Sequence, residues 1–179
     1  MNWANRLTIF RIMLVPVFIT AVFYNKLIFA LIVFCLASLT DAVDGYIARK
    51  RNEKTSFGAI VDPIADKLLI GAAFISLSLV SSLPEYIRIP VYVPIIIISR
   101  DVIILTGIVM LYLTGEEIEI KPTIVSKITT VFQMATIISV LLGFSYSFVI
   151  WNLAAVLTLV SGLDYIRIGS KYVSGLNEK

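Results

Sequence analysis

Four aspartates stand close together in a chain that is otherwise mostly apolar. Asp41 and Asp44 are spaced i, i+3, and Asp62 and Asp66 are spaced i, i+4, so each pair would project from a single face of a helix. Carboxylates in apolar surroundings are costly unless they bind cations or take part in chemistry. The spacing therefore allows four carboxylates to converge on one site.

Small and basic residues share the helix faces that carry these acids. Gly45, Ala48 and Arg49 fall on the face of the first aspartate pair at 100° per residue, and Gly58 falls on the face of the second pair. Small residues allow a ligand to approach the helix closely, and an arginine can hold a phosphate with two hydrogen bonds. Two such stripes facing each other predict a cleft for metal ions.

The available donor types restrict the metal. The chain has no histidine and one cysteine, so a metal site must be built from oxygen ligands, which favour hard divalent ions such as Mg²⁺, Mn²⁺ or Ca²⁺. Three or four neighbouring carboxylates repel one another unless cations bridge them. With two metal ions the natural chemistry is displacement at phosphorus, with one carboxylate free to take a proton from a hydroxyl. Structural ion pairs with Arg49 or Lys67, or acids solvated at a membrane interface, are the alternative interpretations.

The elements that must position these acids are membrane helices. The 179 residues are 59% hydrophobic with a mean hydropathy of +0.95, which indicates an integral membrane protein. About 20 apolar residues are needed for a helix to cross a bilayer. We predict an all-α integral membrane protein of one domain over residues 1–179, with six transmembrane helices and a short amphipathic N-terminal segment. The predicted helices are residues 7–24, 27–49, 56–82, 90–114, 124–145 and 147–173.

Basic residues predict the orientation in the membrane. Only Lys26 and Arg88 flank one predicted side, whereas most other basic residues flank the side of the N-terminus. The positive-inside rule then predicts a multi-pass protein of the cell (inner) membrane, with both termini and the acids facing the cytoplasm. The residues on the cytoplasmic side are Arg6, Lys50, Arg51, Lys54, Lys121, Lys127, Lys171 and Lys179.

A polar stripe begins the first predicted helix. Asn5, Thr8 and Arg11 are spaced i, i+3, i+6, so they should face protein or a polar cavity. Asn5 and Thr8 can also serve as helix caps or make interhelical hydrogen bonds. Arg11 lies deeper, where an arginine usually has a partner or an anionic ligand.

Residues 41–66, called the signature segment below, resemble the signature of the CDP-alcohol phosphatidyltransferase family, D-x2-D-G-x2-A-R-x8-G-x3-D-x3-D, with no position missing. The N-terminal pattern NxxTxxR and the six expected helices extend the resemblance over most of the chain. The matching positions are Asp41, Asp44, Gly45, Ala48, Arg49, Gly58, Asp62 and Asp66.

The resemblance implies a transfer of the phosphatidyl group from CDP-diacylglycerol to an alcohol, with release of CMP. It also implies two divalent cations, Mg²⁺ or Mn²⁺, and a homodimer. Asp66 would in addition be the base for the acceptor hydroxyl. The implied metal ligands are Asp41, Asp44, Asp62 and Asp66, and the implied CDP-lipid-binding residues are Asn5, Thr8, Gly45, Ala48, Arg49 and Gly58.

Within the family, NRLTIFRIMLVPVF and DPIADKLL look most like the phosphatidylglycerophosphate synthases, whose acceptor is glycerol 3-phosphate. Such an acceptor needs cations outside the metal site, and the candidates are Arg100, Lys121 and Lys127. For Arg100, an ion pair with the neighbouring Asp101 is the alternative. Lys121 can also be a snorkelling or topology-setting residue.

One departure points to a different acceptor. The phosphatidylglycerophosphate synthases are expected to carry a further arginine about two turns after Arg100, but DVIILTGIVMLYL contains no basic residue. ISRDVIILTG and IKPTIVSKITTVFQ look more like the single-signature cardiolipin synthases, whose acceptor is phosphatidylglycerol. We place glycerol 3-phosphate first and phosphatidylglycerol second.

Two other classes of protein also place acids in membranes. Intramembrane prenyltransferases bind Mg²⁺ through aspartate motifs, but those motifs are more widely separated than here. Cation-coupled transporters carry buried acids within inverted repeats and broken helices, and this sequence shows no second half that matches the first. Substrate-dependent release of CMP would separate both classes from a phosphatidyltransferase.

Overall fold

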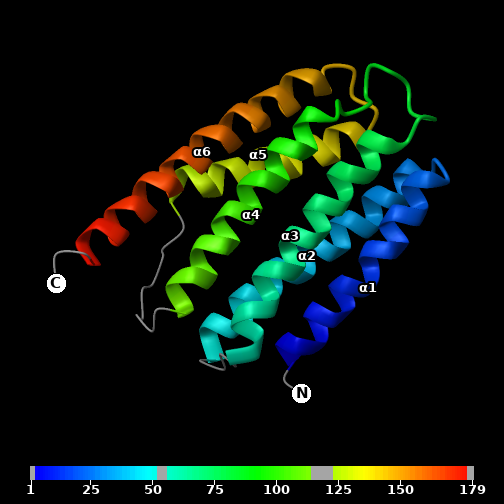
Figure 1. Cartoon of the computed structure of the whole chain (residues 1–179). Coiled ribbons are helices and arrows are strands. Elements are labelled where there is room, and N and C mark those ends of the chain that lie inside the picture. Colours follow the sequence, from blue (N-terminus) through cyan, green and yellow to red (C-terminus); the bar gives the residue numbers. More distant parts are fainter. Residues whose placement is uncertain (1–2, 52–55, 114–122, 177–179) are drawn as a thin grey trace.

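The computed structural model describes the backbone of residues 3–51, 56–113 and 123–176, and the side chains of residues 9–40, 67–107 and 123–167. This part of the chain is all-helical, as predicted, and forms six helices (Figure 1). The helices are α1 (Trp3–Phe23), α2 (Leu27–Arg51), α3 (Ser56–Leu79), α4 (Tyr92–Leu113), α5 (Ile124–Leu141) and α6 (Ser147–Leu176).

The helix ends differ from the prediction by a few residues. The N-terminal residues from Trp3 onward belong to α1, so the predicted amphipathic segment is continuous with the first helix. α5 ends at Leu141 because Gly143 adopts a left-handed conformation, with φ of 70°. The amide of Phe144 donates to the carbonyl of Ser139 at 2.9 Å and that of Gly143 donates to Val140 at 3.0 Å, which is a Schellman motif.

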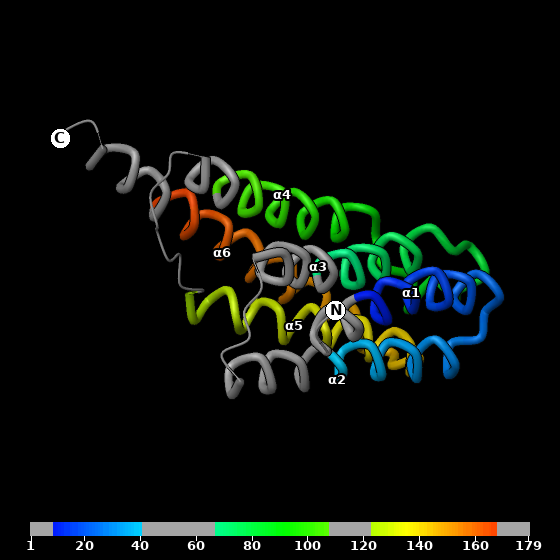
Figure 2. The backbone as a smooth tube through the Cα atoms, turned by 90° about the horizontal axis from the view of Figure 1, so that it is seen from below, coloured from blue at the N-terminus to red at the C-terminus, as the bar shows by residue number. Residues whose placement is uncertain are grey.

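The helices pack as two groups of three. α1 contacts both α2 and α3, while α6 contacts both α4 and α5. Smaller contacts of α3 with α4 and of α5 with α2 and α3 join the two groups (Figure 2). α3 therefore lies at the junction, in contact with α1 of the first group and with α4 and α5 of the second.

The core that joins the helices is apolar and partly aromatic. The rings of Phe18 in α1 and Phe34 in α2 lie 6.0 Å apart between centroids, in a tilted arrangement. Both rings are fully buried, as are Phe74 of α3 and Ile97 of α4. Lipid tails are as apolar as these side chains, so the helices are held together here by close van der Waals packing, and this core fixes α1, α2 and α3 against one another.

Large apolar side chains also cover the outside of the bundle. Within the part of the chain whose side chains are described, α5 and the stretch Ser147–Arg167 of α6 are long and apolar enough to cross a membrane. Shorter apolar stretches are found in α1, α2 and α3. An exposed apolar surface of this extent fits contact with lipid. It includes Met13, Phe29, Leu39, Leu79, Ile95, Val131, Val156 and Leu163.

The direction of the helices shows at which end of the bundle the signature segment lies. The first residues of α1, α3 and α5 lie toward the same end of the bundle as the last residues of α2, α4 and α6 (Figure 1). The signature segment comprises the end of α2 and the beginning of α3, so it belongs to this end. The first residues of α1 and the last residues of α6 lie toward it as well.

Candidate functional site

The backbone of the signature segment is helical on both sides of the connection between α2 and α3. Residues 41–51 belong to α2 and residues 56–66 to α3. Residues spaced i, i+3 or i, i+4 therefore share a helix face, as the prediction requires. The convergence of the side chains stays a prediction, because they lie outside the described residues. The same holds for the side chains of Asn5, Thr8 and Lys121.

The fit of a metal ion rests on the chemistry of the donor set. Among the side chains that the structure describes, no three acidic, histidine or cysteine residues form a group that could hold a metal. The four aspartates of the signature segment supply hard oxygen donors, and the chain contains no histidine. Such a set fits Mg²⁺ or Mn²⁺ and disfavours ions that prefer nitrogen or sulfur.

Arg100 is the centre of a buried polar cluster in the second half of the bundle. Its Nη2 donates to the hydroxyl of Ser126 in α5 at 2.6 Å and to that of Ser161 in α6 at 2.7 Å. Its guanidinium lies over the ring of Tyr165, 5.5 Å from the centroid, at a distance suited to a cation–π interaction. Arg100 thus connects α4 to α5 and α6.

A carboxylate next to Arg100 extends the cluster to α3. Asp101 Oδ1 accepts from Arg100 Nη1 at 2.7 Å and from Lys67 Nζ at 2.7 Å. Lys67 directly follows Asp66, the last residue of the signature segment. We call Lys67, Arg100, Asp101, Ser126 and Ser161 the Arg100 network. It links the helix of the signature segment to α4, α5 and α6.

The predicted acceptor-binding residues differ in burial. Arg100 is only 6% exposed and forms the ion pair with Asp101 that was the alternative to acceptor binding. Three of its five N–H groups are engaged, and within the described part of the chain Nε makes no hydrogen bond. Lys127 is exposed, although its neighbour Ser126 belongs to the Arg100 network. Arg11 is buried, in agreement with its predicted protein-facing position.

Sequence reasoning missed the serines and Tyr165 as partners of Arg100. A signal for Ser126 was present, since polar residues recur along one face of α5 at i, i+3, i+7 and i+10. Thr129, Gln133 and Thr136 of this stripe are buried, and Gln133 Nε2 donates to Thr158 Oγ1 in α6 at 3.1 Å. The stripe therefore marks the face of α5 that packs on α6.

A groove between α3 and α4 runs from the ion pair of Lys67 and Asp101 into apolar surroundings. It has a volume of about 370 Å³. Its polar end is next in sequence to the signature segment, and the remainder is suited to hydrocarbon. The lining residues are Lys67, Leu68, Gly71, Ala72, Ile75, Ile98, Asp101, Val102 and Leu105.

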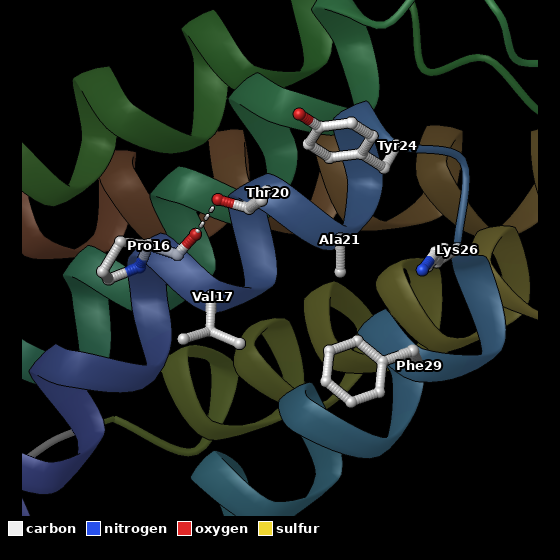
Figure 3. Close-up of a pocket in the computed structure, with 7 residues that line it drawn as sticks. All are labelled: Pro16, Val17, Thr20, Ala21, Tyr24, Lys26 and Phe29. Carbon is white, nitrogen blue, oxygen red and sulfur yellow. Dashed lines mark hydrogen bonds between the residues drawn. The ribbon is translucent and has the colours of Figure 1, made fainter.

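A second cavity lies near the turn between α1 and α2, away from the signature segment (Figure 3). It has a volume of about 380 Å³, and Val17, Ala21 and Phe29 border its interior. Thr20 does not offer a free hydroxyl there, since Oγ1 donates to the carbonyl of Pro16 at 2.7 Å. Lys26 is its one charged lining residue. Without a carboxylate, the cavity lacks the anionic oxygen ligands that Mg²⁺ prefers.

Comparison with known proteins agrees with the signature. The model of the CDP-alcohol phosphatidyltransferase family matches residues 1–160. The chain is 35% identical to a Rickettsia felis protein named CDP-diacylglycerol--glycerol-3-phosphate 3-phosphatidyltransferase, over 96% of this chain and 97% of that protein. A protein of the same name from Wigglesworthia glossinidia brevipalpis is 34% identical, over 94% of each chain. A rat protein named cardiolipin synthase (CMP-forming) is 32% identical, over 98% of this chain and 64% of that protein.

The protein belongs to the CDP-alcohol phosphatidyltransferase family, because the family model covers most of its length and full-length relatives exceed 30% identity. It is therefore an enzyme of phosphatidyl transfer, and the transporter and prenyltransferase interpretations are not retained. The resemblance inferred from the signature segment is confirmed.

Proposed function

We propose that the protein transfers the phosphatidyl group of CDP-diacylglycerol to glycerol 3-phosphate, giving phosphatidylglycerophosphate and CMP. The acceptor hydroxyl oxygen forms a new bond to the phosphorus next to diacylglycerol. The bond from this phosphorus to the CMP oxygen breaks, and CMP leaves with the electron pair. Relatives named for this reaction, similar over nearly the whole chain, support the proposal.

The signature segment supplies the reacting groups in this proposal. Asp41, Asp44, Asp62 and Asp66 would hold two divalent cations, which when bound neutralise the charge that develops on phosphate oxygens. Asp66 accepts the proton of the acceptor hydroxyl. The spacing of these residues in the helices α2 and α3 supports the assignment. The residues that bind the CDP-lipid are Asn5, Thr8, Gly45, Ala48, Arg49 and Gly58.

The burial of Arg100 near α3 is the observation that favours an acceptor with a phosphate group. It is a buried cation on the helix that contacts α3, outside the predicted metal site. Within the part of the chain whose side chains are described, its Nε–H and one Nη1–H remain for a ligand after the three hydrogen bonds of the Arg100 network. A phosphate monoester offers matching acceptor oxygens. Lys127, which is exposed, and Lys121 are the further cations of the proposed acceptor site.

The proposal places all six helices across the cell membrane. The apolar outer surface supports this placement, as does the fact that α1 begins and α6 ends at the same end of the bundle (Figure 1). The positive-inside rule assigns that end to the cytoplasm, where CDP-diacylglycerol presents its nucleotide. The homodimer stays a prediction, which the molecular mass of the detergent-solubilised protein tests.

The test is release of CMP by the purified protein in detergent. CDP-diacylglycerol and Mg²⁺ or Mn²⁺ are supplied with glycerol 3-phosphate, with phosphatidylglycerol or with neither. We expect CMP release with glycerol 3-phosphate, and its loss after removal of divalent cations with EDTA. Release with phosphatidylglycerol alone would contradict the proposed acceptor and identify a cardiolipin synthase. Failure to release CMP under any condition would contradict phosphatidyl transfer to both acceptors.

A further inference from the structure

The carboxylate of Asp101 is shared by two cations through a single oxygen. Its Oδ1 lies 2.7 Å from Lys67 Nζ and 2.7 Å from Arg100 Nη1. The side chains of Asp101, Lys67 and Arg100 are 14%, 22% and 7% exposed, so water screens these charges only in part. Two cations and one carboxylate leave the group with a net charge of one positive.

The position of Lys67 makes this charge balance relevant to the reaction. Lys67 directly follows Asp66 in α3, and consecutive Cα atoms are about 3.8 Å apart. An ammonium on a flexible side chain next to a site for divalent cations opposes their binding if no carboxylate holds it. Arg100 cannot supply that counter-charge, and its own position depends on the same oxygen of Asp101.

We propose that Asp101 is a positioning residue of the phosphatidyl transfer reaction. It holds the ammonium of Lys67 at α4 by an ion pair, and thereby permits divalent cations to bind at the signature aspartates. This inference rests on the proposed function, since it assumes that the signature segment binds those cations. The carboxylate acts through Lys67 and contacts no reacting atom.

The inference is tested by equilibrium binding of Mn²⁺ to the detergent-solubilised full chain, followed by electron paramagnetic resonance without substrates. D101N keeps the size of the side chain and an oxygen that can accept a hydrogen bond, but it releases one positive charge. We expect Mn²⁺ affinity to fall about tenfold, because an additional charge acts at short range in partly desolvated surroundings. D101E restores the carboxylate and should recover the affinity.

The double variant K67M/D101N separates the charge effect from a structural effect. It removes Lys67 together with the carboxylate, so the net charge returns to one positive, and Mn²⁺ affinity should return close to that of the wild type. Asp164→Asn is the matched control, since Asp164 is a partly buried acid of α6 outside the Arg100 network, and it should bind Mn²⁺ normally. Circular dichroism and gel filtration verify that each variant is folded.

The outcomes are separable from those of the CMP assay. Unchanged Mn²⁺ binding by D101N would overturn the role of Asp101, even if the wild type releases CMP. Binding by K67M/D101N as weak as that of D101N would also overturn it, because the loss would then not pass through Lys67. If D101N alone does not fold, the double variant decides: wild-type affinity supports the inference and weak binding overturns it. A wild type that binds no Mn²⁺ would overturn it as well.

Discussion

Arg100 and Ser161 are 61 residues apart in the chain, and Arg100 Nη2 donates to Ser161 Oγ at 2.7 Å. The hydrogen bond joins α4 to the middle of α6 in a buried position. A buried guanidinium needs partners of this kind, because leaving its N–H groups unpaired would cost more than the bonds contribute. The position of this cation is therefore set by tertiary packing of three helices.

The first prediction concerns Arg100 itself. R100K and R100Q should lower kcat/KM for glycerol 3-phosphate by about tenfold to a hundredfold, the effect of losing charge-assisted hydrogen bonds to a phosphate. Lysine should not rescue the function, since it lacks the planar set of donors that reaches three partners at once. The measurement is CMP release at varied concentrations of each substrate.

A split between the two substrates distinguishes this role from a general loss of structure. KM for CDP-diacylglycerol should stay near that of the wild type, while KM for glycerol 3-phosphate rises. Arg88→Gln is the matched control, because Arg88 is exposed in the connection between α3 and α4, and its loss should change neither KM. Equal increases in both KM values for R100K would contradict a specific role of Arg100 in acceptor binding.

The second prediction concerns Asp66. Asp66→Asn should reduce turnover by about 10²- to 10⁴-fold, because the amide cannot accept the proton of the acceptor hydroxyl. The fold should be retained, as judged by circular dichroism and gel filtration. Asp164→Asn makes the same chemical change in α6 and should keep full activity. A fully active Asp66→Asn variant would exclude Asp66 as the base.

The third prediction concerns the buried pair of Gln133 and Thr158 between α5 and α6. Q133L should change the free energy of unfolding by less than about 1 kcal/mol, because no buried donor is left unpaired. The hydroxyl of Thr158 still donates to the carbonyl of Ala154 at 2.6 Å. T158V removes the oxygen that accepts from Gln133 Nε2, so a buried amide loses its partner, at a cost of about 1–3 kcal/mol.

Thermal unfolding in detergent measures this difference. T158V should have a clearly lower midpoint than Q133L, although both substitutions remove the same hydrogen bond. Both variants should keep the wild-type KM for glycerol 3-phosphate, since neither residue belongs to the Arg100 network. The reverse order of midpoints would show that packing volume outweighs the unpaired amide at this position.

The six helices could be predicted from the sequence because the apolar composition of each segment is enough to locate it, without knowledge of its neighbours in space. Apolar runs separated by short polar connections predicted the helix positions to within a few residues. The end of α5 was placed four residues too late because the left-handed conformation of Gly143 and its Schellman hydrogen bonds were not anticipated. Helix ends depend on such local capping, which average hydropathy does not contain.

The Arg100 network could be predicted only in part. The ion pair with Asp101 was an alternative for Arg100, because the two residues are neighbours in sequence. Ser126 and Ser161 lie 26 and 61 residues away, so their contact with Arg100 depends on how α4, α5 and α6 pack. Lys67 was considered as a partner for the signature acids, whereas its partner among the described residues is Asp101.

The last prediction uses Gly162, the residue of α6 that follows Ser161. A Cβ added there would lie 3.5 Å from Arg100 Cγ and 3.9 Å from Arg100 Cβ, which are ordinary van der Waals distances. G162A should therefore fold and keep activity within about twofold of the wild type. G162L extends further into the space of Arg100 and should displace its guanidinium. We expect KM for glycerol 3-phosphate to rise about tenfold to a hundredfold, as misplacement of a binding group by about 1 Å does.

Gly107→Leu is the matched control, since a Cβ at Gly107 would meet no atom within 4 Å, and it should leave this KM unchanged. If G162L kept the wild-type KM, the position of Arg100 would not control acceptor binding, and the acceptor phosphate would have to be bound by other cations.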